Sequence, residues 1–140
     1  SPSRGLGDVY KRQHIFTFDM GVQAQLSRIV IWDYPEYFNG RSYYYLAAPK
    51  RFRIYGSDVL ETSGDLSEWT LLGEYEEIKP SGLPYGQQTN EDFETANAGF
   101  SWDIPIDMPK VRYIRIENLE NWAGGKQFAI AELQAYGNTQ

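Results

Sequence analysis

The segment 33–49 concentrates side chains that could recognise a ligand. Six of its residues are aromatic, and Asn39 and Arg41 add an amide and a guanidinium group. Flat rings can stack on the apolar face of a sugar, while amide and charged groups fix its hydroxyls. Rings in a loop either fold back on the core or contact a ligand, and the sequence leaves both open. The candidate ligand-binding residues here are Tyr34, Tyr37, Phe38, Asn39, Arg41, Tyr43 and Tyr44.

A second candidate lies in the loop 120–127. Trp122 stands there between Asn121 and a pair of glycines, Gly124 and Gly125, with Lys126 following. The glycines free the backbone around one large ring. Trp122 could serve as a sugar platform, or it could plug the end of a β-sandwich. The segment 33–49 is the better candidate of the two.

Catalytic groups are scarce. The single histidine, His14, opens a predicted strand, so no base is available for a nucleophilic triad. The chain has no cysteine, and neither a phosphate loop nor a dinucleotide fingerprint occurs. Acid clusters that could hydrolyse a glycosidic bond lie in polar surroundings and are interpreted as solvated surface. These clusters are Glu76/Glu77, Glu91/Asp92/Glu94 and Glu117/Glu120. No catalytic residue is predicted, and the protein is not expected to be an enzyme.

Composition limits the partners. The 140 residues carry a net charge of -6, which argues against nucleic acid and against anionic lipid. No apolar run is long enough to span a membrane. Aromatic residues make up 16% of the chain, which suits an all-β domain whose rings fill a sandwich or line a binding surface. The basic residues Lys50, Arg51 and Arg53 are interpreted as the wet face of a strand, paired with neighbouring acids.

The hydrophobic pattern predicts short strands separated by turns and long loops. An N-cap hydroxyl at Thr89, an acid at Asp92 and Gly99 at the far end predict one short helix between them. Residues 111–137 are expected to form a hairpin-like unit of two strands joined by a loop. We therefore expect an all-β fold, an antiparallel β-sandwich or jelly roll with one short helix in a long loop. The predicted strands are 14–20, 26–32, 50–57, 69–75, 100–104, 111–116 and 128–136.

Six motifs in a fixed order resemble a known family. They are FTFDMG, LSRIVIW, PKRFRIYGS, a Trp-Thr-Leu-Leu strand, VRYIRI and AIAELQAYG. Together they are similar to the coagulation-factor V/VIII type C, or discoidin-like, domain, which implies a galactose-binding-like jelly roll over residues 14–137. The insertion 78–99 and the WAGG sequence resemble a Bacteroidetes branch, a domain of unknown function. Its members form the C-terminal modules of surface lipoproteins linked to polysaccharide utilisation.

The beginning of the chain departs from this family. Residues 1–13 look like a foreign leader, and residues 138–140 form a tail. A segment that precedes FTFDMG in the family is missing, so we expect a truncated domain that lacks an edge strand. The resemblance implies a structural calcium ion served by the Glu132 carboxylate and the Ala131 carbonyl, although the partner loop is absent.

The resemblance and the aromatic loops together favour one function over another. We expect a non-catalytic carbohydrate-binding or adhesion module at the extracellular or outer-membrane surface, within a longer lipoprotein. Its partner would be a glycan or polysaccharide. The alternative is a structural or protein-interaction domain that contacts neighbouring domains of the same protein and binds no sugar.

Overall fold

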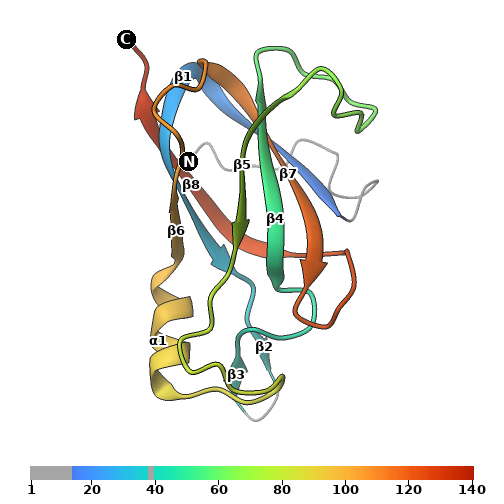
Figure 1. Ribbon diagram of the computed structural model, residues 1–140, viewed down its shortest axis with the longest axis vertical. Coiled ribbons are helices and arrows are strands. Elements are labelled where there is room, and N and C mark those ends of the chain that lie inside the picture. The colour runs from blue at the N-terminus through green and yellow to red at the C-terminus, as the bar shows by residue number, and fades with distance from the viewer. Residues whose placement is uncertain (1–13, 38–39) are drawn as a thin grey trace.

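The protein is a sandwich of antiparallel sheets. The computed structural model describes residues 14–37 and 40–140. One sheet has the order β5–β4–β7–β1, and in the other β1 lies between β6 and β8 (Figure 1). The predicted all-β class with one short helix is confirmed. The elements are β1 Ile15–Asp33, β2 Glu36–Tyr37, β3 Arg41–Ser42, β4 Pro49–Ser57, β5 Thr70–Glu76, α1 Asn90–Ala98, β6 Phe100–Asp103, β7 Val111–Asn121 and β8 Ile130–Asn138.

Strand β1 joins the two sheets, so the prediction of separate strands at 14–20 and 26–32 is wrong. Its first part pairs with β7 and its second part pairs with β8. The register with β7 shifts between Asp19 and Ala24, where Gly21 has a φ of 80° and donates its N–H to Asp19 Oδ1 at 2.8 Å. A bulge of this kind bends a strand without ending it. One strand can therefore serve both layers.

The strands at the end of the chain do not form a hairpin. Strand β7 pairs with β4 and with the first part of β1, whereas β8 pairs with the second part of β1. The predicted strand 111–116 also continues to Asn121. The loop between β7 and β8 therefore crosses from one sheet to the other at the end of the sandwich.

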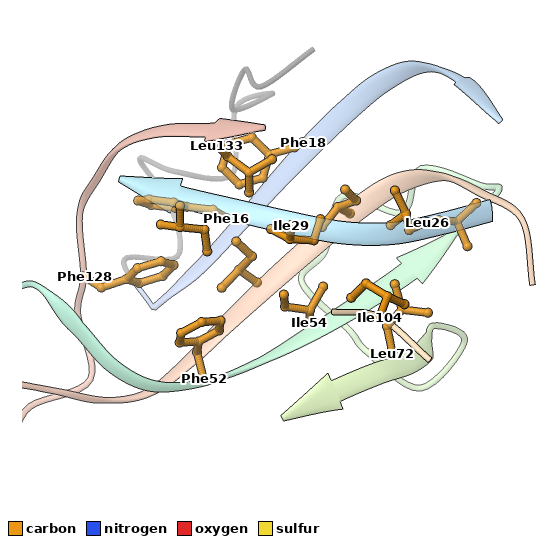
Figure 2. Close-up of a cluster of buried hydrophobic side chains, with 14 residues drawn as sticks. Phe16, Phe18, Leu26, Ile29, Phe52, Ile54, Leu72, Ile104, Phe128 and Leu133 are labelled. Atoms are coloured by element: carbon orange, nitrogen blue, oxygen red, sulfur yellow. The ribbon is translucent and has the colours of Figure 1, made fainter. Parts of the chain in front are cut away.

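The core lies between the two sheets (Figure 2). The Phe16 ring from β1 stacks on Phe128, with ring centroids 4.3 Å apart. On β4, Phe52 and Ile54 are fully buried, while Arg53 on the other face pairs with Glu74 at 3.0 Å. The predicted wet face is confirmed for Arg51 and Arg53, whereas Lys50 lies over the Trp122 ring and forms no ion pair among the described residues. The buried cluster is Phe16, Phe18, Leu26, Ile29, Ile31, Phe52, Ile54, Leu72, Ile104, Val111, Ile114, Ile116, Phe128 and Leu133.

The helix forms where its caps predict it. Asp92 N donates to Thr89 Oγ1, and Thr89 N donates to Asp92 Oδ2, both at 3.0 Å, so the capping box is complete. Gly99 ends the helix with a φ of 93°. Helix α1 lies at the same end of the molecule as the short β2–β3 pair and the chain that follows β5 (Figure 1). No helix in the described part of the chain is long and apolar enough to cross a membrane.

Candidate functional site

Two of the predicted ligand-binding rings are buried. Tyr43 is 6% exposed and Tyr44 is fully buried, so neither can stack on a ligand, and these two assignments are wrong. The Tyr44 hydroxyl donates to the Asp92 carbonyl at 2.9 Å, and its ring meets Phe100 edge-on. Tyr44 also has a left-handed φ of 58°, which is strained for a residue with a side chain. The segment folds back at this point and packs under α1.

Other residues of the predicted segment remain on the surface. Tyr34 is 58% exposed and Tyr37 is 76% exposed. Arg41 donates from Nη2 to the Tyr43 hydroxyl at 2.8 Å and to Asn97 Oδ1 at 3.3 Å, so it ties β3 to α1. Phe38 and Asn39 lie outside the described residues. Tyr34 and Tyr37 are therefore accessible to a ligand, and their role in ligand binding stays a prediction.

A pocket of about 370 Å³ lies at the α1 end of the sandwich, between β4, the chain after β5 and the β7–β8 loop. Aromatic, cationic and acidic side chains share its lining, a mixture that suits a polar ligand with an apolar face. Its polar and aromatic walls are Lys50, Glu76, Glu77, Lys79, Tyr85 and Trp122.

Trp122 forms one wall of this pocket and also closes the end of the sandwich. Its Nε1–H donates to Glu77 Oε1 at 2.9 Å, and its ring meets Tyr44 edge-on with centroids 5.3 Å apart. The Lys50 ammonium lies 4.9 Å from the centroid of the same ring. Trp122 is thus a half-buried side chain that packs at the end of the sandwich, and its role as a sugar platform stays a prediction.

Tyr85 is a wall residue that the sequence reasoning missed. It is 45% exposed, and its ring stacks on Tyr45 with centroids 4.7 Å apart and planes inclined by 19°. Its hydroxyl accepts the Leu46 N–H at 2.9 Å, which fixes the ring. An aromatic residue flanked by Pro84 and Gly86 in a loop was the available signal.

A buried acid pair underlies the pocket. Asp33 is 2% exposed and Glu77 is 1% exposed, so the expectation that Glu77 is solvated is wrong. Burial raises the pKa of Asp33 to about 7. Burial, and next the negative charge of Asp33, raise the pKa of Glu77 well above its ordinary value. The sequence pattern could not reveal the pair because its members are 44 positions apart in the chain.

Asp92 is a third buried acid at this end, and its interpretation as a solvated residue is also wrong. Burial acts to raise its pKa, but hydrogen bonds from Ser81 and Thr89 outweigh that effect and lower it. The Ser81 N–H donates to Asp92 Oδ1 at 2.8 Å. One carboxylate therefore caps α1 and anchors the turn that precedes Tyr85.

The structure brings few candidate ligands to Glu132 for calcium. Glu132 and Ala131 are exposed on β8, and the Glu132 carboxylate accepts from Gln134 Nε2 at 3.2 Å. Within the described ranges no group of three or more His, Cys, Asp or Glu residues could hold a metal ion. Calcium takes 6–8 oxygen ligands, so one carboxylate does not make the site. Calcium stays a prediction of the resemblance, supported only if millimolar calcium raises the melting temperature and Glu132→Gln abolishes that rise.

Three solved structures have folds similar to that of this chain. A SusE-like protein aligns with a TM-score of 0.80 and 37% identity over 88% of this chain and 68% of its own length. CBM32-3 from a family 31 glycoside hydrolase of Clostridium perfringens aligns with a TM-score of 0.59 and 15% identity, over 88% and 65%. The CBM32 of AlyQ, in complex with 4,5-unsaturated mannuronic acid, aligns with a TM-score of 0.51 and 20% identity, over 87% and 69%.

The two carbohydrate-binding modules are less than 25% identical to this chain, so they show that the β-sandwich fold is shared and nothing more. Among curated proteins, no sequence matches significantly. A family model described as a domain of unknown function, DUF5000, matches residues 7–137. The predicted resemblance to a discoidin-like Bacteroidetes domain is thereby confirmed, and the chain belongs to the DUF5000 family.

Proposed function

We propose that this domain is a non-catalytic carbohydrate-binding module whose glycan binds in the pocket between Trp122 and Tyr85. The single observation that carries the proposal is the pocket itself, which offers two aromatic walls with ammonium and carboxylate groups beside them. Fixed rings present flat apolar surface at little entropic cost, and the charged groups can orient hydroxyls. Tyr37 is also exposed, and it belongs to β2, which lies at the same end of the molecule as α1 and the chain after β5 (Figure 1).

The names of similar structures support the non-catalytic role and the setting. Two of them are named as carbohydrate-binding modules, and one as a SusE-like protein. With the sequence resemblance, these names favour a module of a longer lipoprotein at the extracellular or outer-membrane surface. A fold alone hosts many functions, so the site has to carry the proposal.

A glycan array followed by calorimetry tests the proposal. We expect selective binding of one glycan class, and about tenfold weaker binding after Tyr85→Ala, because one stacking wall is lost. Tyr37→Ala measures whether the outer aromatic surface contributes. Tyr136→Ala is the matched control, because Tyr136 is 40% exposed on β8, outside the pocket lining.

The alternative function gives the opposite result. A structural or protein-interaction domain would leave the array flat while the protein stays folded by circular dichroism. Equal losses from Tyr85→Ala and Tyr136→Ala would also contradict the assignment of the pocket, since the two residues do not share it.

A further inference from the structure

Three of the four carboxyl oxygens of Asp33 and Glu77 are buried without a donor in the described part of the chain. In the described part of the chain, no N–H or O–H donates to either oxygen of Asp33 or to Glu77 Oε2. Glu77 Oε1 accepts the Trp122 Nε1–H, and the Glu77 backbone N–H donates to the Lys50 carbonyl at 2.7 Å. Two carboxylates cannot donate to each other. Each carboxyl affects the pKa of the other, and a proton retained by either one would supply a donor to the pair.

The groups around the pair do not neutralise it. Within the described residues Lys50 forms no ion pair, and its ammonium lies over the Trp122 ring. The Lys79 ammonium lies 5.6 Å from the centroid of the Tyr44 ring and donates to the Pro84 carbonyl at 3.2 Å. Burial lowers the pKa of Lys79, against the opposing effect of Asp92.

The remaining titratable groups that face the pair keep their protonation state near neutral pH. Burial, and the negative charges of Glu77, Asp92, Asp33 and Glu91, raise the pKa of the Tyr44 phenol, so it stays neutral. Hydrogen bonds keep the pKa of Asp92 low, so it stays ionised. Ionisation of the acid pair near neutral pH therefore adds buried negative charge at this end of the sandwich. Such a charge favours openings that admit water.

We infer that the Asp33–Glu77 pair is a proton-operated latch, which holds the Trp122 wall of the pocket in place while it retains its protons and loosens that wall when it ionises. The inference rests on the proposed function for its purpose, because Trp122 is the wall that would contact the glycan. Asp33 and Glu77 themselves are positioning residues, since they are buried beneath the ring. Because the latch holds the Trp122 wall in place while it is protonated, we expect the glycan to bind more tightly at mildly acidic pH than at alkaline pH.

The indole Nε1–H signal of Trp122 tests the latch without any glycan. In ¹⁵N-labelled protein, this signal is the one that Trp122→Phe removes, and its chemical shift is followed from pH 5 to pH 9. We expect a single transition near neutral pH in the wild type. The double variant Asp33→Asn/Glu77→Gln should lose the transition, because two amides can hydrogen-bond each other and do not titrate. Glu76→Gln, which alters an exposed acid of the same pocket, should keep it.

Each outcome separates the latch from the proposed function. A flat indole shift in the wild type overturns the latch, as does a transition that persists in the double variant. If the double variant fails to fold, the wild-type titration still decides the matter, together with a loss of hydrogen-exchange protection in residues 77–86 at alkaline pH, measured relative to the intrinsic exchange rate at each pH. A glycan array without binding would overturn the function alone and leave the indole transition in place.

Discussion

At the scale of single residues, Arg115 joins β7 to β1 and to the loop between β4 and β5 through its side-chain hydrogen bonds. Its side chain is fully buried on β7, and its Nε donates to Thr17 Oγ1 at 2.9 Å. Its Nη1 donates to the Asp65 carbonyl at 3.3 Å, Nη2 donates to the Glu61 carbonyl, and the guanidinium lies 4.2 Å from the Trp69 ring centroid. A planar fork with several donors suits this arrangement, and an ammonium group does not. Arg115 thus holds the loop between β4 and β5 against the outer face of the sheet.

Replacing Arg115 with lysine should therefore destabilise the protein although the charge is kept. We expect Arg115→Lys to lower the free energy of unfolding by about 3 kcal/mol, because the buried Thr17 hydroxyl and the part-buried carbonyls of Glu61 and Asp65 lose donors. Urea denaturation measures the change. Arg112→Lys is the matched control three positions earlier on β7, where Arg112 pairs with Asp19 at an exposed site, and its effect should be much smaller. Equal effects of the two substitutions would contradict the role given to Arg115.

At the scale of elements, the C-terminal end of α1 meets Trp32 at Gly99. The Gly99 backbone has a φ of 93° and a ψ of 144°, a region that residues with side chains rarely adopt. A Cβ at this position would lie 2.6 Å from Trp32 Cε2. Gly99 therefore has two roles, since it ends the helix and lets it approach the strand that supplies Asp33.

Gly99→Ala should destabilise the protein through both effects. We expect the left-handed backbone to cost on the order of 1 kcal/mol and the contact with Trp32 to add to that loss. Gly124→Ala provides the comparison, because Gly124 has a φ of 94° and a Cβ added there would meet no atom within 4 Å. Thermal melting of both variants measures the difference. A melting temperature for Gly99→Ala at or above that of Gly124→Ala would refute the contact with Trp32.

Elements with local signals were predictable from the sequence, and those decided by distant pairing were not. The helix followed from Thr89, Asp92 and Gly99, which all lie within one short segment. The continuity of β1 could not be predicted, because Gly21 in the sequence indicates the end of a strand. Only the pairing with β7 and β8 shows that the strand continues. The same limit applies to Tyr43 and Tyr44, which look like surface loop residues until α1 covers them.

For the whole molecule, two small groups of acids give the stability opposite pH dependence. Hydrogen bonds from Arg112 lower the pKa of Asp19, and those from Ser67 lower the pKa of Asp65. Such carboxylates stabilise the fold above their unfolded pKa of about 4, and this stabilisation is lost as the pH falls. Asp33 and Glu77 act in the other direction, because their pKa values are raised in the folded state.

The direction in which the buried pair changes the stability with pH follows from proton binding. Above about pH 4 the folded protein holds protons on Asp33 and Glu77 that the unfolded chain has released, so stability falls as the pH rises toward and through the folded value for Asp33, about 7. Together with the first group, this predicts greatest stability at mildly acidic pH. The pattern of acids in the sequence could not predict this, because it does not distinguish Glu77 from the exposed Glu76.

Melting temperatures measured from pH 3 to pH 9 check this profile. We expect the wild type to lose stability on both sides of a mildly acidic maximum. Asp33→Asn/Glu77→Gln should flatten the alkaline side and leave the acidic side unchanged, because Asp19 and Asp65 are untouched. Asp19→Asn should do the reverse, since it removes one of the acids whose pKa is lowered. A wild-type maximum on the alkaline side, or an alkaline decline that survives the double substitution, would show that the buried pair is not its cause.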